Sequence, residues 1–187
     1  MNTKMNRQSH SSMFMALLLL VAAVLACSSG NETEKANKLV DEGNKAVQEA
    51  KTFLTDAEAK KTKMLQTDVS ELDEARATAK ESIAAYDKAK EKCKEASKKY
   101  EEASKLKLND KFKEYLTLKV KEYDKRAELL ETAKGTPQAL IDSESRAAFI
   151  GMASANNERV ARLTKEADDL AAQADKLQKD NPNIFKS

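Results

Sequence analysis

Apolar residues recur in steps of three and four after residue 30, the pattern of an amphipathic helix. The first such row consists of Ala36, Val40, Gly43, Val47, Ala50, Leu54 and Ala57. The row is interrupted between residues 60 and 68 and resumes in a shifted register. Thr67 and Asp68, which favour helix starts, lie at this interruption. We therefore predict a turn near residues 66–70, with a register shift inside one long helix as the alternative.

The next stretch has the most regular spacing in the chain. Two rows repeat every seven residues, the first made of Leu72, Ala79, Tyr86, Cys93 and Tyr100 and the second of Ala75, Ser82, Ala89, Ala96 and Ala103. Because most of these side chains are small, the rows predict a helix that approaches its neighbour closely.

Two further helices are predicted. One runs from about residue 111 to 134, with Asn109 or Asp110 as its N-cap. Gly135-Thr136-Pro137 then indicates a break, since Gly suits the position after a helix, Thr caps and Pro favours a first turn. A kink in a longer helix is the alternative. The last helix is predicted from about residue 137 to 179, ended by Asp180-Asn181-Pro182.

These patterns predict an all-α fold, because no stretch of the chain alternates with period two. We expect an elongated antiparallel bundle of three to four long, coiled-coil-like helices over residues 32–180. Residues 181–187 would form a short C-terminal tail.

The first 26 residues have the three parts of an export signal. Lys4 and Arg7 form a basic start, and residues 13–25 form an apolar run that is too short to span a bilayer. The run closes with Val24-Leu25-Ala26-Cys27, which resembles a bacterial lipobox. The resemblance implies that a signal peptidase recognises Leu25, Ala26 and Cys27 and removes residues 1–26.

The same resemblance implies that Cys27 carries palmitate-like acyl chains that hold the protein on a membrane. An ordinary signal peptide or a short membrane anchor is the alternative. Residues 27–31 would be a lipidated tether, with Asn31 capping the first helix. Because Ser28 rather than Asp follows Cys27, the resemblance favours the outer membrane, facing the periplasm, in a bacterium with two membranes. In either case the expected location is the cell envelope.

Composition excludes several function classes. Removing residues 1–26 takes away Lys4 and Arg7, so 33 basic residues become 31, which equals the 31 acidic residues. A neutral chain with interspersed charges does not indicate nucleic-acid binding. The only His precedes Cys27, so the remaining chain has no imidazole base and no usual zinc site. We expect no catalysis, no cofactor and no metal.

Cys93 and the aromatic residues are the remaining chemical candidates. Cys93 lies in the seven-residue row and is interpreted as a packing residue, with an intermolecular disulfide as the alternative. The aromatic set is predicted to fill the core, with a ligand cavity between helices as the alternative; it comprises Tyr86, Tyr100, Phe112, Tyr115, Tyr123 and Phe149. An acidic surface row is also present, made of Glu122, Asp124, Glu128 and Glu131, but its helical spacing disfavours a Ca²⁺ cage.

The lipobox, short tether and heptad helix together resemble murein lipoprotein, a family that attaches to peptidoglycan through a C-terminal Lys. Here Ser187 follows Lys186 and the chain is far longer, so covalent attachment is not expected. Residues 95–106 and 179–185 also resemble Lys-, Glu- and Ala-rich helical envelope lipoproteins, which imply no activity. The sequence predicts a lipid-anchored structural or protein-interaction module that binds an envelope protein or itself. A small-molecule or lipid-binding lipoprotein with an aromatic-lined cavity is the alternative.

Overall fold

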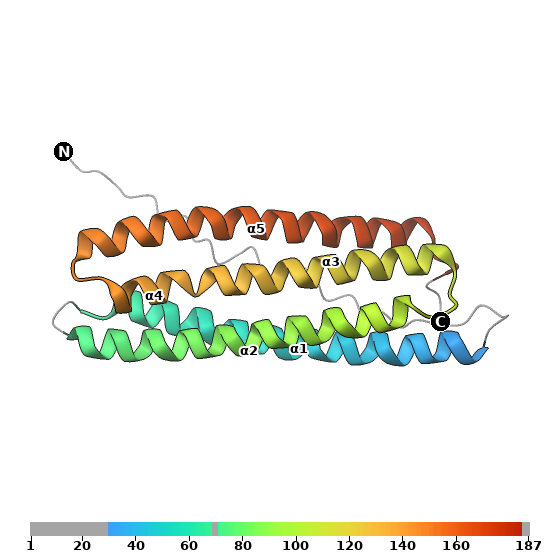
Figure 1. Ribbon diagram of the computed structural model, residues 1–187, viewed down its shortest axis with the longest axis horizontal. Coiled ribbons are helices and arrows are strands. Elements are labelled where there is room, and N and C mark those ends of the chain that lie inside the picture. The colour runs from blue at the N-terminus through green and yellow to red at the C-terminus, as the bar shows by residue number, and fades with distance from the viewer. Residues whose placement is uncertain (1–29, 69–70, 185–187) are drawn as a thin grey trace.

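The computed structural model describes residues 30–68 and 71–184 (Figure 1). They form an all-α rod, with the helices α1 (Gly30–Gln66), α2 (Leu72–Ser104), α3 (Asp110–Ala133), α4 (Gly135–Asp142) and α5 (Arg146–Asp180). The four long helices run along the rod and the short α4 lies at one end (Figure 1). The predicted antiparallel bundle of three to four long helices is therefore confirmed.

Helices α1 and α2 form the most extensively packed pair. The first ends at Gln66 and the second begins at Leu72, so the predicted break between two helices is confirmed, while residues 69 and 70 lie outside the described part of the chain. Ala and other small side chains line the α1–α2 contact, as the seven-residue rows indicated. At Gly43 a Cβ atom would lie 3.0 Å from the Tyr100 ring, a contact so tight that the ring would have to shift. The Tyr100 hydroxyl is fixed because it donates to Asn44 Oδ1 at 2.8 Å. Small residues such as Gly43 thus let the two backbones approach closely.

Helix α1 begins earlier than predicted. It starts at Gly30, so residues 30 and 31 of the expected tether belong to the helix, and Asn31 lies inside the first turn rather than at a cap. In that first turn Glu32 accepts a hydrogen bond from the backbone N of Lys107 at 3.3 Å. This contact joins the start of α1 to the α2–α3 turn.

Helix α3 packs between α2 and α5 and carries much of the core. Asn109 is its N-cap, and its side chain accepts from Lys111 N at 2.8 Å, as predicted. Tyr115, Leu116 and Tyr123 are buried on its inner face. The rings of Tyr123 and Tyr100 lie 5.6 Å apart, which ties α3 to α2.

The predicted single helix over residues 137–179 is wrong, because the chain reverses at residues 143–145. The backbone stays helical through Lys134, and Gln138 N donates to Lys134 O at 3.0 Å, so α4 continues from α3. Thr136 is buried and bonded to Asn156 of α5 instead of capping. The real break lies at Ser143, which is extended, and Ser145, whose side chain caps α5 by accepting from Ala148 N at 3.2 Å.

Candidate interaction surface

The predicted lipidation residues lie outside the part of the chain that the structure describes. Leu25, Ala26 and Cys27 precede the first described residue, Gly30, so lipidation stays a prediction. In the described residues, no helix is both long and apolar enough to cross a membrane.

Cys93 lies in the core between α2 and its neighbours. Its side chain is 3% exposed, and burial raises the pKa of its thiol to about 12. The thiol is therefore neutral near pH 7 and is not presented to a second chain. This placement favours the interpretation as a packing residue, because an intermolecular disulfide would require the helices to separate.

The predicted aromatic set fills the core instead of lining a cavity. Five of its six members are buried, namely Tyr86, Tyr100, Phe112, Tyr115 and Tyr123. The Tyr86 hydroxyl donates to Glu58 Oε1 at 2.5 Å, and burial raises the pKa of this phenol. Phe149 is half-buried near the start of α5. These side chains hold the long helices together by packing.

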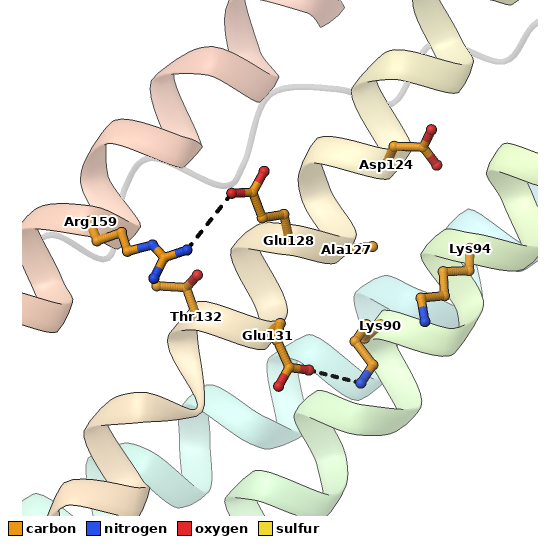
Figure 2. A pocket seen from close by; sticks show the side chains of 8 residues that line it. All are labelled: Lys90, Lys94, Asp124, Ala127, Glu128, Glu131, Thr132 and Arg159. Carbon is orange, nitrogen blue, oxygen red and sulfur yellow. Dashed lines mark hydrogen bonds and ion pairs between the residues drawn. The ribbon is translucent and has the colours of Figure 1, made fainter.

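A shallow groove of about 330 Å³ lies between α2, α3 and α5 (Figure 2). Its lining is charged and contains no aromatic side chain; it comprises Lys90, Lys94, Asp124, Ala127, Glu128, Glu131, Thr132 and Arg159. The charges face one another across the groove: Lys90 Nζ lies 2.8 Å from Glu131, and Arg159 lies 4.0 Å from Glu128 (Figure 2). A ligand here would have to compete with these internal ion pairs.

The acidic row predicted on the surface of α3 divides between core and surface. Glu122 is 1% exposed, whereas Asp124, Glu128 and Glu131 line the groove. Glu122 accepts from Lys119 Nζ at 2.6 Å and from Arg126 Nε at 2.9 Å. Its place in the core was not predicted, because Glu between Lys and Arg is typical of a solvated face.

The spacing carried a signal that could have located this buried ion cluster. Lys119, Glu122 and Arg126 follow one another at steps of three and four. They share the face of α3 that carries the buried Tyr115 and Tyr123. The carboxylate is balanced by both cations, and Arg126 also reaches Asp168 of α5 at 3.4 Å. The cluster therefore links α3 to α5.

The large apolar side chains that are exposed gather at one end of the rod. Among the described residues they are Leu65 (52% exposed), Leu72 (40%), Ile150 (55%) and Met152 (47%). The first two flank the α1–α2 turn and the others lie at the start of α5, at the end of the rod opposite Gly30 (Figure 1). We call this end, residues 65–68, 71–76 and 142–152, the tip.

The two halves of the tip are joined by direct contacts. Arg76 of α2 donates to the Ser143 carbonyl oxygen at 3.5 Å, and Ser143 Oγ lies 3.8 Å from Met152 Sδ. Lys63 and Glu74 form an ion pair at 3.0 Å across the α1–α2 turn. The exposed apolar side chains are thus carried by one connected part of the fold.

Comparison of the chain with protein-family models, curated proteins and solved structures finds no match.

Proposed function

We propose that this protein is a lipid-anchored spacer of the bacterial envelope, without catalytic activity, that presents its tip to a protein partner. The lipobox-like Leu25-Ala26-Cys27 supports the anchor. The rod supports the spacing, since the 37 residues of α1 correspond to about 55 Å of helix.

The observation that carries the proposal is the position of the exposed apolar side chains. Along the body of the rod the described large apolar residues are buried or half-buried, while Leu65, Leu72, Ile150 and Met152 are exposed at the end opposite Gly30. Exposed large apolar side chains that gather in one region are typical of interaction sites, because covering them removes apolar surface from water. An anchor near Gly30 would hold this surface away from the membrane.

The close-packed core supports a mechanical role over ligand binding. The aromatic residues that could line a cavity are buried against other side chains, and the groove in Figure 2 is lined by paired charges. Typical ligand sites are largely apolar with a few polar groups. The geometry therefore favours the interaction module over the small-molecule alternative.

The anchor is tested in cells with an alkyne-tagged fatty acid. The wild-type chain should take up the label and sediment with membranes, and Cys27→Ser should abolish both. A matched Cys93→Ser variant should keep both, because Cys93 is buried in the core. A wild-type chain that is unlabelled and found in the soluble fraction would contradict the proposal.

A further inference from the structure

We infer that the tip docks an apolar polypeptide segment whose ends are rich in Lys and Arg. This inference rests on the proposed function, in which the tip is the contact surface. Two properties of the tip support it. Large apolar side chains are exposed there, and acidic residues outnumber basic ones.

Acidic residues lie close in sequence to the exposed apolar residues of the tip. From residue 67 to 75 the chain has four acidic and no basic residues, Asp68, Glu71, Asp73 and Glu74, and the facing corner adds Asp142 and Glu144. Glu71, Asp73 and Glu144 are exposed and make no ion pair within the described residues. Their charge is therefore available to a partner.

Four cations near the tip have described side chains, and the protein itself engages each of them. Lys60 pairs with Asp56 at 2.6 Å and Lys61 with Glu58 at 2.5 Å. Lys63 pairs with Glu74, and Arg76 points to the Ser143 carbonyl oxygen. The tip also contains Arg146, and its six acidic residues outnumber its two basic ones, Arg76 and Arg146. A chain that is neutral after residue 26 therefore carries a locally negative end.

This charge distribution selects among the possible occupants. A second copy docked tip to tip would place Glu71, Asp73 and Glu144 against the same carboxylates, which repel. An anionic lipid surface would be repelled for the same reason. An apolar segment with basic ends would cover the exposed leucines, and its Lys and Arg side chains would form ion pairs with the carboxylates. Such a segment therefore matches both properties of the tip.

The test is a binding titration with the purified full chain, followed by fluorescence anisotropy of a labelled probe. The probe is a synthetic peptide with a leucine-rich centre and lysines at both ends. Its twin has glutamates at both ends. Vesicles of phosphatidylglycerol and sedimentation of the chain alone test the lipid and self-association alternatives. Every titration is repeated at low and high salt, because exposed ion pairs are screened.

Two variants localise the binding. The triple variant Glu71→Lys, Asp73→Lys, Glu144→Lys should weaken lysine-ended peptide binding by about threefold to a hundredfold, since each of the three exposed pairs contributes about 1.4- to fivefold. The double variant Leu65→Ser, Leu72→Ser should weaken it at both salt concentrations. As a control, Glu34→Lys, Asp41→Lys, Asp169→Lys reverses three exposed acidic residues away from the tip and should leave binding unchanged. Circular dichroism confirms that each variant is folded.

The expected result is a preference for the lysine-ended peptide that is lost in the tip variants and weakened by salt. Equal binding of both peptides, equal loss in the control variant, stronger binding to vesicles, or tip-dependent dimers would overturn the inference. The acylation experiment is independent of these results. A chain that is lipidated but binds no peptide refutes the inference alone, and a chain that binds the peptide but is not lipidated refutes the anchor alone.

Discussion

Replacing Glu122 by glutamine should destabilise the rod strongly, because it removes the charge shared by the buried Lys119 and the partly exposed Arg126. Glu122 is 1% exposed and Lys119 is 6% exposed. The Glu122 carboxylate lies 2.6 Å from the Lys119 ammonium. In the variant, this ammonium would stay in the core without a neighbouring anion. Arg126 is better protected, because it keeps Asp168 at 3.4 Å and is partly in water.

The expected cost follows from the burial of the pair. Removing one partner of a buried ion pair costs about 3–5 kcal/mol, because the other charge is left without compensation. For a chain of this size each kcal/mol lowers the melting temperature by about 2–4 °C. Glu122→Gln should therefore lower the melting temperature by about 6–20 °C.

The assay is thermal and urea unfolding followed by circular dichroism. The matched control is Glu114→Gln, since Glu114 pairs with Lys111 at 2.7 Å with the same spacing but is about half exposed. The control should cost less than about 1 kcal/mol. The double variant Lys119→Met, Glu122→Leu should be more stable than Glu122→Gln, because it removes the buried charge together with its partner. Equal costs for Glu122→Gln and Glu114→Gln would refute this reasoning.

Three further predictions concern packing, thiol chemistry and pH. Gly43→Ala should lower the free energy of unfolding by about 1–3 kcal/mol relative to Gly151→Ala, because a Cβ at Gly43 meets the Tyr100 ring while none lies within 4 Å at Gly151; similar melting temperatures for the two variants would contradict the close α1–α2 contact. Cys93 should react slowly with a thiol reagent near pH 7 and rapidly in urea, since burial raises its pKa to about 12; fast reaction of the folded chain would show that the thiol is accessible. Hydrogen bonds from Lys134 and Lys90 lower the pKa of Glu131, so its contribution to stability is present above its ordinary value of 4.5 and is lost as the pH falls through the lowered value. The melting temperature of Glu131→Gln should therefore fall less than that of the wild type as the pH is lowered through this range. An equal fall in both proteins would contradict the stabilising role of the ionised Glu131.

The first three helices could be predicted from sequence because local signals and packing agree there. Small residues at seven-residue spacing fixed the α1–α2 seam, and Asn109 caps α3 as expected. The break after Asp142 was missed because Ser143-Glu144-Ser145 resembles any polar helix surface, while Gly135-Thr136-Pro137 is a stronger local signal. The tertiary contact of Thr136 with Asn156 overrides that signal.

The candidate surface could not be predicted from sequence, because exposure depends on which helix faces remain uncovered. In the sequence, nothing distinguishes the exposed apolar residues of the tip from those that are buried; they are Leu65, Leu72, Ile150 and Met152. They are exposed because the rod ends there and no further helix among the described residues covers them. Glu122 is the reverse case, because its sequence neighbours are typical of a surface position but the packed helices bury it.

The most direct test of the account is site-specific photo-crosslinking in living cells of the native host. A photoreactive amino acid is placed at Leu65 or Met152 of the tip, and at Asp41 or Asp169 of the body as matched exposed controls. The account predicts one discrete protein adduct from both tip positions and none from the body positions. The same adduct from all four positions, or adducts from the body alone, would contradict a spacer that makes contact through its tip.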